Sequence, residues 1–183
     1  MSKLSAGIVV YRKNSTNGFQ VLLVHPGGPF WKNKEEGAWS IPKGEYEEGE
    51  DPLKAAKREF TEETGNILPE GNFIQLAPVK TTSGKVISAW AIEADFEPCF
   101  IQSNYFEMEW PPRSGKKQSF AEVDKAAWFT IDEAALKMNK GQLPFLQQIT
   151  LLKERFYTNG VIPRRKYSML NVQYSYKNQV YRA

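Results

Sequence analysis

The segment from Gly44 to Gly65 reads GEYEEGEDPLKAAKREFTEETG and is the most informative part of the 183-residue chain. Its carboxylates Glu59, Glu62 and Glu63 are spaced i, i+3 and i+4, so a helix would project all three from one face. Like charges at this spacing repel one another, and a bound divalent cation would remove that repulsion. A set of oxygen ligands suits Mg²⁺ or Mn²⁺ better than zinc, which prefers histidine and cysteine. The spacing therefore predicts a magnesium or manganese site.

Signals at both ends predict that a helix spans about Pro52–Thr64. Asp51 can cap its first turn, where a proline fits because no amide donor is needed, and Gly65 can close it in a left-handed turn. The apolar residues that follow the spacing of a buried stripe are Leu53, Ala56 and Phe60. The carboxylates are therefore expected to face away from the core, toward a cleft.

Arg58 and Glu50 complete the pattern of charges around this helix. The guanidinium of Arg58 can hold the carboxylate of Glu50, which lies in the preceding loop, and can orient Glu59. Partners of this kind keep metal ligands in place, so both residues are predicted to support the site.

This arrangement resembles the Nudix box of Nudix hydrolases. The matching positions are Gly44, Glu50, Arg58, Glu59, Phe60, Glu62, Glu63 and Gly65. Only the last position of the box departs, because Asn66 stands where the family usually has an aliphatic residue. The resemblance implies an α/β fold, an α/β/α sandwich with a mixed β-sheet and the Nudix loop-helix-loop, over residues 1–155. Residues 156–183 would then form a basic, tyrosine-rich C-terminal extension.

The resemblance also implies a metal-dependent hydrolase that cleaves a pyrophosphate bond in a nucleoside diphosphate-linked substrate. The expected metal ligands are Glu59, Glu62, Glu63 and the carbonyl oxygen of Gly44. The base that takes the proton from the attacking water stays open between Glu59, Glu63 and a carboxylate outside the box. Glu122 is the first outside candidate, as base or as an extra metal ligand, and Glu109 is the second.

Four further residues are candidates for substrate binding: Lys43, Trp31, Trp110 and Arg113. The two cations could neutralise phosphates and the two tryptophans could stack on a nucleobase, although solvated surface and core packing are the ordinary alternatives. The sequence PKG at residues 42–44 is similar to that of dinucleoside polyphosphate hydrolases. We therefore expect a small-molecule nucleotide substrate, either a nucleoside triphosphate or a dinucleoside polyphosphate.

Two other functions are compatible with the same residues. An acidic helix is often only solvated and ion-paired, and this explanation suits the variable loop residues Glu45, Glu47 and Glu48. A Nudix-fold protein could also bind a nucleotide as a sensor without turnover. The intact set of carboxylates favours the enzyme, because a sensor does not need every one of them.

The composition is that of a soluble globular domain, with 41% hydrophobic and 25% charged residues. No apolar run approaches the roughly 20 residues of a membrane span, and the N-terminus lacks the apolar core of a secretory signal. We expect a cytoplasmic protein that does not bind membranes. Its only histidine, His25, ends a strand-like run and is expected to be a hydrogen-bonded structural group.

Basic charge is concentrated at the end of the chain. From Arg155 onward there are six basic and no acidic residues, together with five of the eight tyrosines. Such a tail could bind RNA, which would make the protein an RNA-directed pyrophosphohydrolase, or it could pack on the domain or on the second subunit of a homodimer. The single short cluster of basic residues at 164–166 favours packing over nucleic-acid binding.

The rest of the chain alternates between strand and helix patterns. Strands are predicted at residues 5–11, 19–24, 39–41, 73–79, 85–97 and 127–129, and further helices at 132–138 and 143–156. Residues 26–37 and 103–118 are predicted to be loops.

Overall fold

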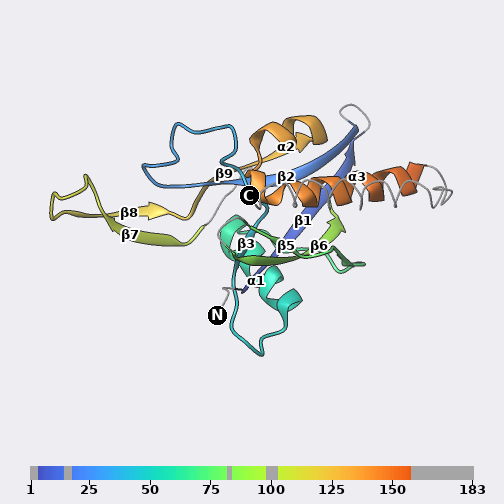
Figure 1. The fold of residues 1–183 in the computed structure, drawn as a ribbon, viewed down its shortest axis with the longest axis horizontal. Coiled ribbons are helices and arrows are strands. Elements are labelled where there is room, and N and C mark those ends of the chain that lie inside the picture. The colour runs from blue at the N-terminus through green and yellow to red at the C-terminus, as the bar shows by residue number, and fades with distance from the viewer. Residues whose placement is uncertain (1–3, 15–17, 82–83, 98–102, 158–183) are drawn as a thin grey trace, which may run out of the picture. The chain divides into compact units, whose positions relative to one another are not determined.

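The computed structural model describes residues 4–14, 18–81, 84–97 and 103–157 (Figure 1). The chain divides into two compact units, residues 1–149 and residues 150–183, and the fold described below belongs to the first. Most of the predicted C-terminal extension, residues 158–183, lies outside the described residues, so the RNA and homodimer hypotheses stay predictions. Within the described part of the chain, no helix has both the length and the apolarity needed to cross a membrane.

A mixed sheet of seven strands forms the centre of the domain. Its main path has the order β4-β6-β1-β2-β9, while β3 pairs with β1 and β5 pairs with β6. The strand bounds are β1 (Leu4–Asn14), β2 (Gly18–Pro26), β3 (Lys43–Glu45), β4 (Ile74–Gln75), β5 (Val79–Lys80), β6 (Val86–Glu93) and β9 (Val123–Thr130). The pair β1 and β6 is parallel and the other pairs are antiparallel, which makes the sheet mixed.

Helices cover the sheet because alternate strand residues are buried on each face. Ala6, Ile8 and Val10 of β1 pack in one core cluster with Ala56 and Phe60 of α1 (Pro52–Thr64). The residues between them on β1 are buried as well, so both faces of this strand are covered. Helix α2 (Ile131–Lys137) contacts β2 and β9. The 3-10 helix η1 (Lys140–Gln142) then leads into α3 (Leu143–Tyr157), whose first turns bury three apolar side chains: Phe145, Leu146 and Ile149.

The prediction of a loop at residues 103–118 is wrong. Strands β7 (Tyr105–Glu109) and β8 (Lys117–Ala121) form a separate two-stranded antiparallel sheet there (Figure 1). Their side chains alternate, so that Phe106 and Met108 lie on one face while Glu107 and Glu109 lie on the other. The turn between the strands contains two residues with positive φ, Arg113 (65°) and Gly115 (69°).

Two shorter strand predictions also need correction. Residues 39–41 form no strand, because Trp39 and Ser40 make only isolated bridges and the pairing with β1 begins at Lys43. The predicted strand at 73–79 is divided into β4 and β5. The division lies beside Pro78, which cannot donate a ladder hydrogen bond.

Candidate active site

Helix α1 carries the acidic residues of the site, and its ends have the predicted caps. The carboxylate of Asp51 accepts hydrogen bonds from the backbone N–H groups of Leu53 (2.9 Å) and Lys54 (3.1 Å). Gly65 adopts a left-handed conformation with φ 69°, and its N–H group donates to the carbonyl oxygen of Thr61. Because Phe60 is fully buried, the helix is fixed against the sheet in one rotation.

The carboxylates of α1 hold the loop that precedes it. The carboxylate of Glu59 lies directly against Gly44, where a residue with a Cβ atom would have no room. The carboxylate of Glu63 accepts a hydrogen bond from the backbone N–H of Lys43 at 3.0 Å. The carbonyl oxygen of Gly44 accepts one from Oγ of Ser5 at 2.7 Å. The glycine of the loop is therefore required for the close approach of helix and loop.

Arg58 contacts three carboxylates. Its guanidinium lies 2.7 Å from the carboxylate of Glu59, 3.2 Å from that of Glu62 and 3.5 Å from that of Glu50. It also donates to the carbonyl oxygen of Glu45 at 3.4 Å. One cation thus connects the loop to two of the acidic residues on the helix.

Burial and like charges raise the pKa values of two carboxyl groups. Burial, with smaller contributions from the charges of Glu59 and Glu122, raises the pKa of Glu63 to about 7, although Lys43 acts in the opposite direction. Burial also raises the pKa of Glu59, and Glu62 and Glu122 add to that effect while Arg58 opposes it. Glu122 therefore lies within electrostatic range of both helix residues, although it comes from the short link between β8 and β9.

The donor set fits a hard divalent cation in its chemistry. Every candidate ligand is an oxygen, and ionised carboxylates that raise one another's pKa are stabilised by a cation between them. In the ranges that the structure describes, no three acidic, histidine or cysteine side chains already surround a common point as metal ligands do. Glu62 is instead paired with Arg58, so its rearrangement would have to accompany metal binding.

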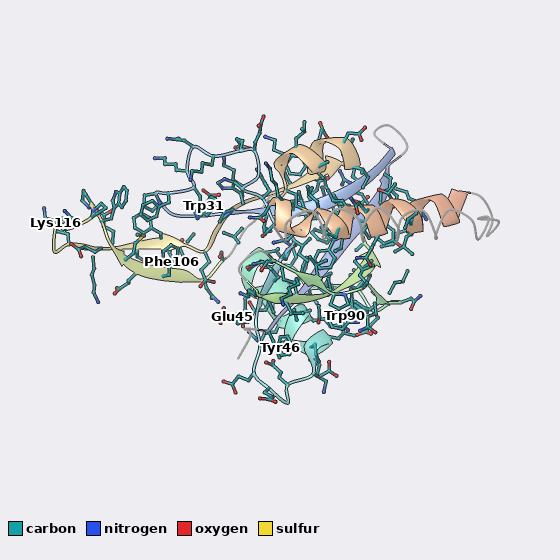
Figure 2. The ribbon with its side chains drawn as sticks, viewed as in Figure 1. Trp31, Glu45, Tyr46, Trp90, Phe106 and Lys116 are labelled. Carbon is teal, nitrogen blue, oxygen red and sulfur yellow. The ribbon has the colours of Figure 1, made fainter. Side chains whose placement is uncertain are left out.

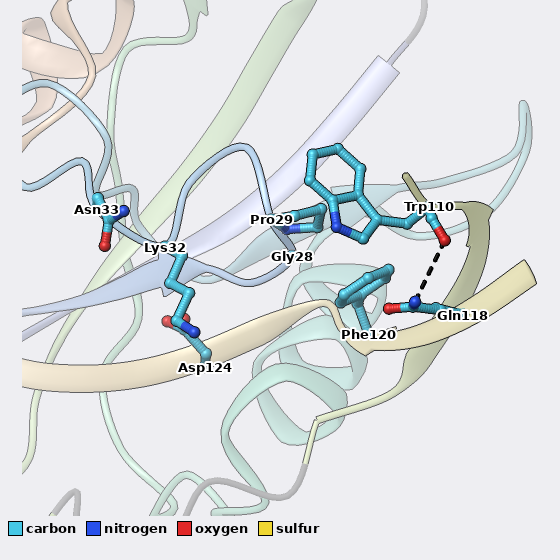
Figure 3. Close-up of a pocket in the computed structure, with 8 residues that line it drawn as sticks. All are labelled: Gly28, Pro29, Lys32, Asn33, Trp110, Gln118, Phe120 and Asp124. Atoms are coloured by element: carbon cyan, nitrogen blue, oxygen red, sulfur yellow. Dashed lines mark hydrogen bonds between the residues drawn. The ribbon is translucent and has the colours of Figure 1, made fainter. Parts of the chain in front are cut away.

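Two cavities lie beside Glu122, between the loop at residues 26–33 and the β7–β8 hairpin. The first, which we call the aromatic pocket, has a volume of about 360 Å³ and is lined mainly by apolar side chains together with Glu122. These include Phe30, Trp31, Phe106 and Met108. The second, which we call the polar pocket, has a volume of about 500 Å³ and is shown in Figure 3. Both pockets contain Gly28 and Pro29 in their walls, so they adjoin each other.

Glycines allow the hairpin to approach this loop closely. The N–H group of Gly27 donates to the carbonyl oxygen of Glu122 at 2.9 Å, and a side chain at Gly27 would collide with the backbone of Ala121. Gly28 has φ 87° and lies against Phe106, while Phe30 and Trp110 form an edge-to-face pair at 5.3 Å. These contacts make Glu122 and both pockets parts of one region.

The predicted substrate residues are placed at different points of this region. Lys43 lies on β3, where its charge lowers the pKa of Glu63. Trp31 lines the aromatic pocket and Trp110 lines the polar pocket, whereas Arg113 is in the hairpin turn and lines neither. Glu109, the second outside candidate, accepts a hydrogen bond from the N–H of Gly115 in that same turn.

Sequence reasoning missed most residues of the two pockets. The apolar face of the hairpin (Phe106, Met108 and Phe120) could have been found from the alternation at residues 105–109, which is typical of a half-buried strand. No comparable signal marks the polar lining residues, because polar side chains at these positions have the sequence pattern of ordinary surface.

Comparison with known proteins identifies the family. The sequence profile of the NUDIX domain matches residues 1–149. Nudix hydrolase 25 of Arabidopsis thaliana is 56% identical over 34 residues, an alignment that spans 19% of this chain and only 19% of that protein. The fold resembles the Ap4A hydrolase of C. elegans in a binary complex, with a TM-score of 0.56 and 20% identity over 86% of this chain and 99% of that one. It also resembles the NUDIX domain of Shewanella oneidensis NrtR complexed with ADP ribose, with a TM-score of 0.56 and 20% identity over 82% and 89% of the two chains.

The chain belongs to the Nudix family. The predictions of this family and of a mixed α/β Nudix fold are confirmed, and the assignment supports the predicted enzyme class, a Nudix pyrophosphohydrolase.

Proposed function

We propose that this protein is a metal-dependent pyrophosphohydrolase that cleaves a phosphoanhydride bond in a nucleoside diphosphate-linked substrate. A nucleoside triphosphate or a dinucleoside polyphosphate is the proposed substrate class. The observation that carries this proposal is the meeting of Glu59 and Glu63 with Glu122 beside Gly44, in a domain of the Nudix family.

The reaction consumes one water molecule. The water oxygen forms a bond to phosphorus, the bridging P–O bond breaks, and two phosphate products leave while a carboxylate takes the proton of the water. When bound, Mg²⁺ or Mn²⁺ would neutralise the phosphate oxygens and make the water more acidic. We propose that Glu59, Glu62, Glu63 and the carbonyl oxygen of Gly44 hold it, and that Arg58 and Glu50 keep these ligands oriented.

The neighbouring groups suggest how the substrate lies. Lys43 is close enough to Glu63 to affect its pKa, so its ammonium group is a candidate partner for a phosphate. The aromatic pocket contains Glu122 and the half-exposed ring of Trp31, which suits a nucleobase whose phosphates extend toward α1. The similar structures named above are of proteins described with Ap4A and with ADP ribose, and both compounds contain a nucleoside diphosphate joined to a second group.

Product analysis by chromatography tests this proposal. Nucleoside triphosphates, dinucleoside polyphosphates, nucleotide sugars and capped RNA would each be incubated with the full chain and Mg²⁺ or Mn²⁺. Release of phosphate products from one class, dependent on the metal, is the expected result. Tight binding without turnover across the panel would contradict it and would indicate a nucleotide sensor.

We expect Glu122→Gln to lower kcat by about a hundredfold with little change in KM, because a general base or metal ligand acts mainly in the transition state. The substitution keeps the shape of the side chain and removes its charge from the neighbourhood of Glu59 and Glu63. The matched control is Glu109→Gln, in the hairpin turn, for which we expect a change of less than about twofold. Steady-state kinetics would contradict the assignment if the two variants behaved alike.

A further inference from the structure

The polar pocket has two chemically different walls. One is formed by the rings of Trp110 and Phe120, and the other carries Lys32, Asn33 and Asp124 (Figure 3). The amide nitrogen of Gln118, which also lines the pocket, donates to the carbonyl oxygen of Trp110 at 3.2 Å. Its amide oxygen therefore remains available as an acceptor. The pocket thus offers an apolar surface opposite a set of hydrogen-bonding groups.

Asp124 is fixed in this wall by the buried histidine. One carboxylate oxygen, Oδ1, lies 2.6 Å from Nδ1 of His25, whose Nε2 lies 2.7 Å from the carbonyl oxygen of Lys34. Because a carbonyl only accepts, Nε2 carries a proton. Nδ1 then either donates to an ionised Asp124 or accepts the proton of a neutral one. In both states Oδ2 of Asp124 is an acceptor, and no hydrogen bond to it is found within the described ranges.

The composition of these walls favours one kind of ligand. A hydroxyl group both donates and accepts, so neighbouring hydroxyls on a ring match a wall that contains a carboxylate, an amide and an ammonium group. The apolar face of the same ring can pack on an indole. A free phosphate fits less well, because Asp124 would repel it. A nucleobase fits less well too, because it would present one flat apolar face to the polar wall.

We propose that the polar pocket binds a sugar ring with vicinal hydroxyls as part of the substrate. This inference rests on the proposed function, since the ring is attached to the nucleotide whose base occupies the adjoining aromatic pocket. The ring is either the ribose of that nucleoside or a second sugar beyond the phosphates, and the chemistry of recognition is the same for both. The hydroxyls contact Asn33, Lys32 and Asp124, while the ring packs against Trp110.

Three related compounds distinguish the sources of the ring. The first is an adenosine diphosphate hexose. The second is the cyclohexyl ester of adenosine diphosphate, which keeps a six-membered ring and lacks its hydroxyls. The third is the 2′,3′-dideoxyadenosine form of the first compound. A site built to bind hydroxyls rejects analogues that lack them, so one analogue should lose about tenfold or more in kcat/KM. Loss with the cyclohexyl ester identifies a second sugar, and loss with the dideoxy compound identifies the ribose.

Variants of the polar wall connect this preference to the pocket. Asn33→Ala and Lys32→Ala change exposed side chains, so the fold should persist. Each should lower kcat/KM about tenfold for the complete compound and less than about twofold for the analogue without the relevant hydroxyls. Lys116→Ala is the control, because Lys116 is exposed in the hairpin and lines neither pocket. Equal losses on all three compounds, or no preference for hydroxyls in the unmodified protein, would overturn the inference.

The same compounds can be compared by calorimetric binding to the unmodified protein, which requires no turnover. If none is hydrolysed but the hydroxyl preference and its loss in Asn33→Ala appear in the dissociation constants, the proposed reaction fails and the sugar site stands. If the compounds are hydrolysed without any hydroxyl preference, the reaction stands and the sugar site fails. The two proposals are therefore tested separately.

Discussion

Replacing Glu63 by glutamine (Glu63→Gln) is expected to lower kcat/KM by about a thousandfold, the scale seen when a group that stabilises the transition-state charge is lost. The variant should still fold, because the amide oxygen of glutamine can accept the hydrogen bond that the N–H of Lys43 donates at 3.0 Å. The loss would then come from the missing negative charge and not from a displaced loop. Steady-state kinetics on the substrate found in the panel, with circular dichroism as a check of the fold, measures this effect.

The matched control is Glu48→Gln in the loop before α1. Glu48 is exposed, and its sequence pattern is that of a solvated loop residue, so this change should alter kcat/KM less than about twofold. A Glu63→Gln variant that keeps more than a tenth of the normal activity would remove Glu63 from the proposed metal ligands.

The helix of the site could be predicted from sequence because its signals are local. Asp51, Pro52 and Gly65 lie within two residues of the observed ends of α1, and they act through the backbone groups nearest to them. The contacts of Arg58 with Glu50 and Glu59 follow from the same short range, since all three residues lie within ten positions of one another.

The hairpin at residues 105–121 could not be recognised by its polarity. Its strands are exposed on one face and bury Phe106 and Phe120 only in part, so the average composition is that of a loop. Strand pairing depends on residues distant in sequence, such as the register of Phe106 with Phe120 across the turn. The alternation of apolar and acidic residues was the available signal, and it is short.

The two pockets depend on long-range contacts in a similar way. Glu122 approaches Glu59 and Glu63 across about sixty residues of sequence, which spacing alone does not reveal. Asp124 is held by His25 across 99 positions, and this contact needs the pairing of β2 with β9. Local patterns therefore predict the metal loop and its helix, while the part of the site that would select a substrate is defined only by the fold.

The raised pKa of Glu63 leads to a second large effect, on stability. Burial raises the pKa of Glu63 to about 7 from an ordinary value of 4.5. Between these two pH values the folded protein holds a proton on this group that the unfolded chain has released. The free energy of unfolding must therefore decrease as the pH rises through this window, by at most about 3 kcal/mol, in the metal-free protein. The raised pKa of Glu59 acts in the same direction.

Thermal unfolding in the presence of a chelator, followed from pH 5 to pH 8, measures this dependence as the difference between the unmodified protein and Glu63→Gln. The difference isolates Glu63, because both proteins share every other titrating group. The lowered pKa values of Glu35 and Glu133 act below pH 4.5, outside the window. We expect the variant to be the more stable protein at pH 8, and its advantage to vanish at pH 5.

Added Mg²⁺ should reverse this order. A cation that binds the ionised carboxylates stabilises the folded state by mass action, so at pH 8 the Tm of the unmodified protein should rise by several degrees. The Tm of Glu63→Gln should change much less, because one charged ligand is missing. If Mg²⁺ and Mn²⁺ both left the Tm of the unmodified protein unchanged at pH 8, these carboxylates would not be a metal site. The lower stability of the metal-free protein would then have another cause. The repulsion that makes this group of carboxylates costly for the fold is, on our proposal, the same property that makes it a binding site for a divalent cation.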